Sequence, residues 1–289
     1  MSLILSRRPM PELPEVEVTR RALAGDVEGA VVRALVVRQR RLRWPVPATL
    51  ARHLIGRRIL RLERRGKYLL WRFEGGTMIS HLGMSGSWRA LRGAMPPPGP
   101  HDHVDLEVEH GRGTTVLRLT DPRRFGALLW QRGGERELGR HPLLARLGIE
   151  PFDPRFDGMF LHSRTRGRRS AIKQVLLAGD VVVGVGNIYA SESLFRAGID
   201  PRLPAARLSR ARCGHLAQAI VEVLGAAIDA GGSSLRDFVG VGGEIGRFTR
   251  DARVYERNGL VCRQCGVATV RRIVQSGRAT YFCPRCQRR

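Results

Sequence analysis

Alternation of apolar and polar residues dominates the first half of the chain and predicts β-strands there. Val104-Asp105-Leu106-Glu107-Val108 repeats with a period of two, which is typical of a strand with one buried face. Glycine- and proline-rich turn signals separate such runs. Many short strands with few helices indicate an antiparallel β-sandwich or barrel, which we expect to span residues 11–140. The predicted strands are Val31–Arg38, Tyr68–Phe73, His103–Glu109, Thr115–Leu119 and Ala127–Gln131.

The second half of the chain has a helical period instead. Residues 141–160 contain three prolines and are expected to form a connector. In Arg210–Ala230 the apolar residues recur every three or four positions and predict one buried helix face, made of Cys213, Leu216, Ile220, Leu224 and Ile228. Ser209 is a suitable N-cap for this helix. The other predicted helices are Pro14–Ala24, Ser170–Leu177 and Asn187–Ala197, and the last two helices of the chain form a helix–turn–helix-like pair. The fold class is therefore a multi-domain α+β protein.

The charge of the chain indicates a polyanionic partner. Its 50 Lys and Arg residues exceed its 26 Asp and Glu residues, which gives a net charge of +24 over 289 residues. Basic residues are spread along the chain, so nucleic acid is a better match than a membrane surface, and a generally basic protein is the remaining alternative. No apolar run approaches the roughly 20 residues of a membrane-spanning helix.

The cysteines predict a metal site near the C-terminus. Cys262 and Cys265 form one Cys-x-x-Cys pair, and Cys283 and Cys286 form a second one after a spacer of seventeen residues. Two such pairs match a tetrahedral four-thiolate zinc site in a reducing compartment, with a reduced, metal-free pair as the alternative. We expect a zinc-stabilised β-hairpin domain over residues 251–289. Cys213 lies apart and is expected in the core.

One segment near the N-terminus allows two interpretations. It is Pro11-Glu12-Leu13-Pro14-Glu15-Val16-Glu17. It is a good helix start, because proline and acidic residues suit a first helical turn. If the mature chain begins at Pro11, it also presents a secondary amine, which titrates near 8 and is a nucleophile at neutral pH. Such an amine attacking a sugar C1′ gives an iminium ion directly, with Glu12 beside it as proton donor. We therefore expect residues 1–10 to be a leader or tag outside the mature enzyme.

Three further motifs are ordinary turns when each is considered alone. Residues 64–68 form a basic turn that reads as a solvated charge run, and residues 81–87 form a glycine-rich loop with an apolar tip at Met84. Residues 121–126 place Arg123 and Phe125 on a tight turn after a strand. A fork of donors next to an apolar wedge is also what a probe of stacked bases needs.

Taken in order from Pro11 to the end, the motifs resemble the formamidopyrimidine-DNA glycosylase family, which acts on oxidised purines in DNA. The residue Leu13 favours this family over the related endonuclease VIII family, which typically has glycine there and prefers oxidised pyrimidines. The matching segments are PELPEVE at 11–17, RRGKYLL at 64–70, HLGMSGS at 81–87, HDHVDL at 101–106, DPRRFG at 121–126, GVGNIYASE at 184–192 and GRATYFCPRC at 277–286.

The resemblance implies a role for each matching residue. Pro11 is the expected Schiff-base nucleophile and Glu12 the proton donor, while Lys67 assists β-elimination and Arg278 assists δ-elimination. In the family the damaged nucleotide is flipped out of the duplex. The residues expected to fill the gap are Met84, Arg123 and Phe125, and Arg123 is expected to face the cytosine left without a partner. The expected DNA contacts are His81, Met84, His101, Arg123, Phe125, Arg168 and Asn187.

The resemblance also implies an architecture and a setting. It implies a sandwich with a flanking helix, a helix–two-turn–helix DNA-binding domain at 141–250 and a zinc-finger hairpin. The protein is expected to be a monomer with one structural Zn²⁺ and no organic cofactor, acting on double-stranded DNA in the bacterial cytoplasm at the nucleoid. The hydrophobic segment at 239–248 departs from many family members and affects the expected base preference. The alternatives are an endonuclease VIII-like glycosylase and a non-catalytic zinc-ribbon protein that binds nucleic acid.

Overall fold

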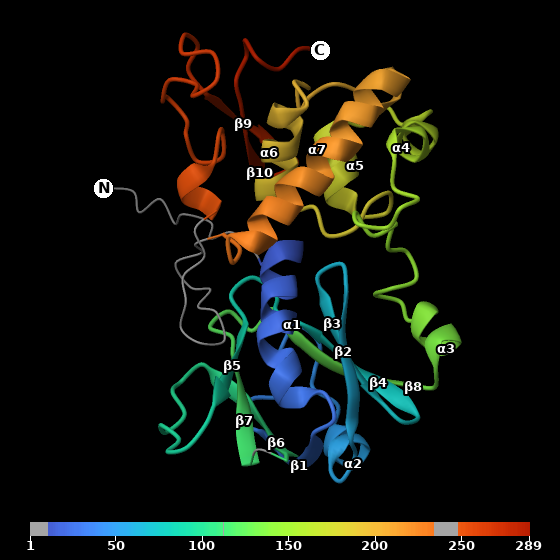
Figure 1. Cartoon of the computed structure of the whole chain (residues 1–289), viewed down its shortest axis with the longest axis vertical. Coiled ribbons are helices and arrows are strands. Elements are labelled where there is room, and N and C mark those ends of the chain that lie inside the picture. The colour runs from blue at the N-terminus through green and yellow to red at the C-terminus, as the bar shows by residue number, and fades with distance from the viewer. Residues whose placement is uncertain (1–10, 112, 234–247) are drawn as a thin grey trace. The chain divides into compact units, whose positions relative to one another are not determined.

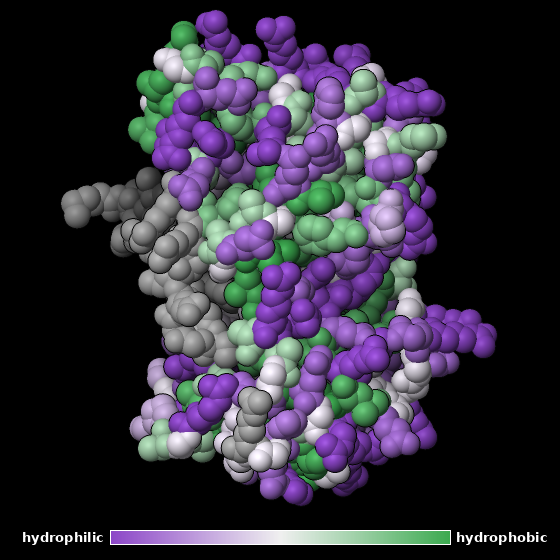
Figure 2. Space-filling model, viewed as in Figure 1, coloured by the Kyte–Doolittle hydropathy of each residue, from purple (hydrophilic) through white to green (hydrophobic). Residues whose placement is uncertain are grey.

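The computed structural model describes residues 11–111, 113–233 and 248–289 (Figure 1). The expected leader at 1–10 and most of the 239–248 segment therefore lie outside the described residues. Within the described chain, residues 11–145 form one compact unit, and residues 146–233 together with 248–289 form another. Hydrophilic side chains cover much of the visible face of each unit, as the excess of arginine leads one to expect (Figure 2).

The first unit contains two four-stranded antiparallel sheets, so the predicted sandwich-type architecture is confirmed. One sheet has the order β1-β6-β7-β5 and the other the order β2-β3-β4-β8. The strands of the first sheet are β1 (Val31–Val37), β6 (Asp102–His110), β7 (Gly113–Thr120) and β5 (Ser87–Leu91). Those of the second are β2 (Ile59–Arg65), β3 (Tyr68–Phe73), β4 (Gly76–His81) and β8 (Ala127–Arg132).

Strands β2, β4 and β5 were absent from the sequence-based prediction. Strand β4 lies between β3 and β8, and residues 76–80 are buried on both faces, which hides any alternation of apolar and polar residues. Strand β2 lies at a sheet edge, where Arg61, Glu63 and Arg65 interrupt its apolar residues. Burial set by neighbouring strands therefore decides these elements.

Helix α1 (Leu13–Val27) packs against strands of both sheets. It extends three residues beyond its predicted end, and its fully buried face includes Leu13, Val16, Leu23 and Val27. The backbone N–H of Glu12 donates to the Glu15 carboxylate at 2.7 Å, which satisfies a donor at the helix start. Two short helices, α2 (Leu50–Leu54) and α3 (Glu135–Gly139), complete the described part of this unit.

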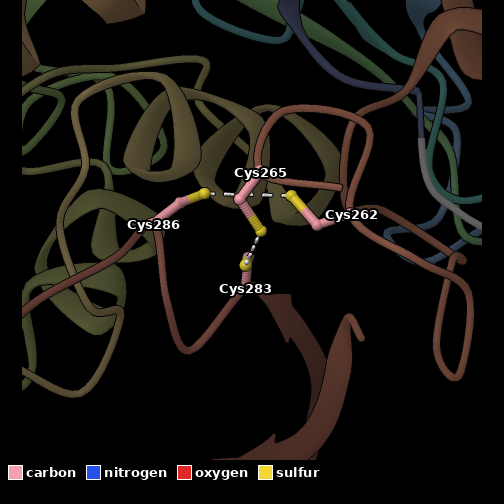
Figure 3. A group of neighbouring side chains, drawn as sticks. All are labelled: Cys262, Cys265, Cys283 and Cys286. Carbon is pink, nitrogen blue, oxygen red and sulfur yellow. Dashed lines mark hydrogen bonds between the residues drawn. The ribbon is translucent and has the colours of Figure 1, made fainter. Parts of the chain in front are cut away.

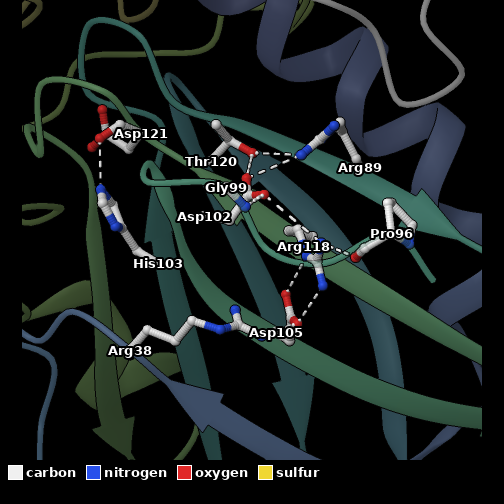
Figure 4. A network of polar contacts seen from close by, with 10 residues as sticks. All are labelled: Arg38, Arg89, Pro96, Gly99, Asp102, His103, Asp105, Arg118, Thr120 and Asp121. Atoms are coloured by element: carbon white, nitrogen blue, oxygen red, sulfur yellow. Dashed lines mark hydrogen bonds and ion pairs between the residues drawn. The ribbon is translucent and has the colours of Figure 1, made fainter.

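A buried ion network joins neighbouring strands of the first sheet (Figure 4). Arg118 on β7 is only 2% exposed and donates two hydrogen bonds to Asp105 on β6, at 2.8 and 2.9 Å. It also donates to the carbonyl of Pro96 at 2.9 Å, and Arg38 donates to the same Asp105. Each charge is thus paired and hydrogen-bonded, the condition for burying it without a large cost.

The second unit is helical and ends in a hairpin. It contains α4 (Gly158–Thr165), α5 (Ile172–Ala178), α6 (Asn187–Arg196) and α7 (Arg210–Asp229), two 3-10 turns at Ala205–Arg207 and Phe248–Asp251, and the hairpin strands β9 (Arg271–Gln275) and β10 (Arg278–Phe282). The predicted buried face of α7 is confirmed, Cys213 included, and it packs against α4 and α6. Ser209 caps α7 by accepting from the N–H of Arg212 at 3.3 Å.

The predicted connector holds for residues 141–157 but not for its last three residues, and helix α4 was not among the predicted helices. The connector expected over residues 141–160 contains the start of α4, because Asp157 accepts from the N–H of Phe160 at 2.7 Å and caps a helix there. The prolines at 142, 151 and 154 all precede this cap, so they do not interrupt the helix.

The Arg118 network yields a stability prediction. We expect Arg118→Ala to lower the free energy of unfolding by about 3–5 kcal/mol, because it leaves Asp105 buried without its main partner. The matched control is Arg33→Ala, which removes an exposed ion pair with Glu109 and should cost less than about 1 kcal/mol. Urea unfolding followed by circular dichroism measures both, and equal losses would contradict the prediction.

The same pair predicts an acid dependence. Burial raises the pKa of Asp105, but hydrogen bonds from Arg118 and Arg38 outweigh it, so the net pKa lies below its usual value of 3.8. The stabilisation is therefore present above that value and is lost as the pH falls through the folded pKa. Arg118→Ala should flatten this acid limb.

Candidate functional site

The four C-terminal cysteines converge as predicted (Figure 3). Their sulfur atoms all lie within 4.8 Å of one another, and the Cys262–Cys286 and Cys265–Cys283 pairs are each 3.9 Å apart. Four thiolates at a Zn–S distance of about 2.3 Å in a tetrahedron stand roughly 3.8 Å apart. The donor set and its spacing therefore fit one structural Zn²⁺, which would hold the hairpin to the preceding turn.

Local structure favours the thiolate form at Cys265, one of the four cysteines. Backbone N–H groups of Val267 and Ala268 point at the Cys265 sulfur and lower its pKa to about 6, which favours the thiolate that zinc needs. Gln287 holds the Cys283–Cys286 segment in place. It accepts from the N–H of Cys283 at 2.8 Å and donates to the carbonyl of Ile199 at 2.8 Å, which ties the knuckle to the loop after α6.

In the first unit, the loop that carries Met84 lies against the loop that carries Arg123 and Phe125. Ser85, next to Met84, accepts a hydrogen bond from the backbone N–H of Arg123 at 3.3 Å. The Arg123 guanidinium lies over the Phe125 ring, 4.8 Å from its centre, and the ring is 40% exposed. An exposed aromatic ring covered by a cation is a suitable surface for contacting bases.

His81 lies at the end of β4 with a defined tautomer. Its Nδ1 accepts from the backbone N–H of Gly83 at 2.9 Å, so the neutral ring carries its proton on Nε2. Burial, together with the positive charges of Lys67 and Arg43, lowers the pKa of His81 to about 4. The centres of the His81 and Tyr68 rings are 4.8 Å apart. His81 is thus a neutral N–H donor beside two cations at pH 7.

Arg43 is a residue of this site that the sequence analysis missed. Its positive charge contributes to lowering the pKa of His81 and partly opposes the burial that raises the pKa of Tyr68. Its backbone N–H donates to the carbonyl of Gly126 at 3.1 Å. The signal was the basic and aromatic run at residues 40–44, which lies outside any predicted strand.

The expected catalytic residues of the first unit lie at the start of α1 and on the turn between β2 and β3. Pro11 and Glu12 are buried, and Glu12 is 2% exposed at the N-cap of α1. Lys67 is half-buried on the turn. Arg64 links these two places, because it pairs with Glu17 of α1 at 3.1 Å and donates to the carbonyl of Gly66 at 3.2 Å.

His101 occupies an exposed turn before β6. It lines a groove of about 410 Å³ together with Arg38, Gln39, His103 and Arg124, among others. The carbonyl of His101 accepts from the backbone N–H of Asp121 at 2.9 Å, so its turn is joined to the one that bears Arg123.

In the second unit, Asn187 and the hairpin residue Arg278 are neighbours. Asn187 is the first residue of α6, and its side-chain NH₂ donates at 3.0 Å to the carbonyl of Ala279, next to Arg278. The other side-chain atom, Oδ1, is buried and has no hydrogen-bond partner among the described residues. Arg168 instead forms an ion pair with Asp180 at 2.9 Å.

Lys173 on α5 is a second residue that the sequence analysis missed. It is fully buried and donates to Thr280 Oγ1 at 2.8 Å and to the carbonyl of Ala279 at 3.2 Å. Its signal was a lysine next to the apolar Ile172 in a predicted helix. Lys173 and Asn187 thus hold the same hairpin strand from two helices.

Solved structures share this whole architecture. The MutM (Fpg) protein of Thermus thermophilus is 40% identical, with a TM-score of 0.83 over 96% of this chain and 98% of that one. The Fpg protein of Lactococcus lactis is 31% identical, with a TM-score of 0.86 over 96% of this chain and all of that one, and was solved with DNA containing an abasic site. Fold and site thus define the class of zinc-finger DNA glycosylases.

Sequence comparison gives the family itself. Residues 10–128 match the formamidopyrimidine-DNA glycosylase N-terminal domain, residues 147–239 match its H2TH domain, and residues 259–289 match the zinc finger found in FPG and IleRS. Formamidopyrimidine-DNA glycosylases of Bordetella pertussis and Burkholderia multivorans are 60% and 56% identical, over 97% and 96% of this chain and the full length of both relatives. The chain belongs to the formamidopyrimidine-DNA glycosylase family.

The cysteine cluster predicts the metal content. We expect Cys265→Ser to release zinc and to weaken DNA binding, because three thiolates and a hydroxyl bind zinc less well and the hairpin then lacks its main cross-link. Cys213→Ala is the matched control, since Cys213 is buried against Thr165 away from the cluster and should leave zinc at one per chain. Mass spectrometry of the metal checks this, and equal zinc in all proteins would contradict it.

The environment of His81 predicts its protonation. We expect imidazole NMR signals to show the Nε2–H tautomer and a titration midpoint near 4, because burial and two cations oppose protonation. The unfolded chain takes up this proton near 6.5, so between pH 4 and 6.5 the unfolded state binds more protons and stability falls on acidification. A midpoint above 6 would contradict this account.

Proposed function

We propose that this base-excision repair glycosylase removes oxidised purines, such as 8-oxoguanine and formamidopyrimidines, from double-stranded DNA and then cleaves the abasic site. The observation that supports this most directly is the identity of 56–60% over nearly the whole chain to formamidopyrimidine-DNA glycosylases. The exposed Arg123–Phe125 pair and the cations around His81 provide groups suited to bases and phosphates.

The proposed chemistry starts from Pro11 as the first residue. Its secondary amine attacks C1′ of the damaged nucleotide, the C1′–N bond breaks, and the base leaves with a proton. Opening of the sugar ring, with Glu12 as proton donor to the ring oxygen, gives an iminium ion between Pro11 and C1′. Loss of a C2′ proton then expels the 3′ phosphate, and a second elimination expels the 5′ phosphate. Lys67 assists the first elimination and Arg278 the second.

This chemistry requires the damaged nucleotide to leave the helix, since C1′ is inaccessible in a stacked duplex. We propose that Met84 and Phe125 fill the gap and that Arg123 hydrogen-bonds the orphaned cytosine. The phosphate contacts come from His81 through Nε2–H, His101, Arg168, Asn187 and Lys67. Unstacking costs a few kcal/mol, which these contacts offset.

The proposal also assigns modules and a setting. Residues 11–140 form the catalytic sandwich, 141–250 the helix–two-turn–helix DNA-binding region and 251–289 the zinc finger, in a protein that acts as a monomer. Residues 1–10 are outside the mature enzyme. The enzyme acts on chromosomal DNA at the nucleoid of a bacterial cell. The described residues contain no helix long and apolar enough to cross a membrane.

Borohydride trapping tests the nucleophile. We expect protein whose first residue is Pro11 to form a covalent adduct with a duplex containing 8-oxoguanine opposite cytosine, because borohydride reduces the iminium ion to a stable amine. Protein that retains residues 1–10 should form none, since its Pro11 nitrogen is an amide. Peptide mapping locates the adduct and intact mass verifies each N-terminus.

Two comparisons complete this experiment. Pro11→Gly, placed at the N-terminus, should lose most excision but keep affinity for a duplex with a stable abasic-site analogue. A preference for thymine glycol over 8-oxoguanine would instead assign the enzyme to oxidised pyrimidines. No adduct from a verified Pro11 terminus, even on an abasic duplex, would leave a non-catalytic DNA-binding protein.

A further inference from the structure

Asp121, directly after β7, is a fully buried carboxyl group at the centre of the loops around Met84 and Arg123. Both of its side-chain oxygens accept hydrogen bonds. Oδ1 accepts from the hydroxyl of Ser85 at 3.0 Å, and Oδ2 accepts from the backbone N–H of Gly126 at 2.7 Å. One bond therefore spans two loops that are 36 residues apart, and the other closes the loop that bears Arg123.

The backbone of Asp121 extends the same arrangement. Its N–H donates to the carbonyl of His101 at 2.9 Å, and its carbonyl accepts from the N–H of Arg124 at 3.1 Å and from Nε2 of His103 at 2.8 Å. Figure 4 shows the His103 contact. Asp121 is thus joined to the turn of His101 as well as to the two loops.

The two loops also approach too closely to move independently. A Cβ on Gly83 would stand 2.3 Å from the backbone of Phe125, and one on Gly126 would stand 2.8 Å from the carbonyl of His81. Gly83 has a φ of +64°, a backbone conformation that is strained for residues with a side chain. Ser85, which is 5% exposed, then accepts from Arg123 N–H while it donates to Asp121.

We propose that Asp121 and Ser85 are positioning residues that hold Met84, Arg123 and Phe125 as one rigid unit for discriminating the base opposite the lesion. Neither residue reaches DNA from its buried position, so each acts through the side chains it fixes. A guanidinium distinguishes bases only when its fork is held in register with the base edge. Loss of the inter-loop bond lets Arg123 shift relative to Met84, and displacements of about 1 Å are enough to lower rates strongly.

This inference rests on the proposed function, so the experiment measures base discrimination and stability separately. Single-turnover excision of 8-oxoguanine is compared opposite cytosine and opposite adenine, in protein with a Pro11 terminus. We expect Ser85→Ala to lower the cytosine-to-adenine rate ratio by about tenfold, the size of one well-formed base contact. The matched control is Ser80→Ala, which removes the buried hydrogen bond that Ser80 accepts from Trp88 at 3.1 Å in the same unit. It should lower the melting temperature but leave the ratio unchanged.

Asp121→Asn is the second variant, in case Ser85→Ala fails to fold. Its amide retains one oxygen for Ser85, but the NH₂ group cannot accept from Gly126, so the ratio should again fall. Arg123→Ala gives the cytosine-to-adenine ratio expected when the side chain that contacts the opposite base is absent. If the unsubstituted enzyme shows no preference between the two duplexes, the proposed role of Arg123 fails. If it shows a preference and both positioning variants keep it while losing stability, Asp121 and Ser85 are only structural and the inference is overturned.

Discussion

Buried carboxylates that accept several hydrogen bonds hold strands and irregular segments of this protein in place. The chain has about twice as many basic as acidic residues, yet several acidic groups are almost fully buried. Asp105 neutralises Arg118 inside a sheet, Asp121 joins two loops, and Glu192 of α6 accepts from three successive backbone N–H groups at 253–255. Charge-assisted bonds to backbone donors are strong and directional, so one carboxylate can fix a segment that has no regular structure.

The zinc-finger hairpin depends on a second set of constraints. Too few apolar residues lie around Cys262 and Cys283 for a core of their own, so four thiolates on one ion replace a core. Lys173 and Asn187 then anchor β10 to two helices through the Ala279 carbonyl and Thr280. This double attachment sets where Arg278 begins the strand. A metal and two polar anchors thus place a residue on which the proposed chemistry relies.

The site combines cations with a histidine that stays neutral. Burial and the charges of Lys67 and Arg43 lower the pKa of His81, so its ring can donate a hydrogen bond without adding a charge. A neutral donor with a fixed tautomer is selective in direction, whereas the surrounding cations provide attraction for phosphates at longer range. The two properties are complementary for an enzyme that must bind any sequence and stop at one nucleotide.

Sequence alone was enough to predict the zinc ligands, the buried face of α7 and the family, because cysteine spacing, helical period and the order of motifs are local properties of the chain. It could not reveal β4, whose pattern is hidden by burial on both faces, or α4, whose cap at Asp157 follows a proline-rich segment. Nor could it show Lys173, Arg43 or the Asp121–Ser85 bond as parts of a site. These roles depend on contacts between residues that are far apart in the chain. The Ser85–Asp121 bond spans 36 positions and the Lys173–Thr280 bond spans 107, and only tertiary packing brings such groups together.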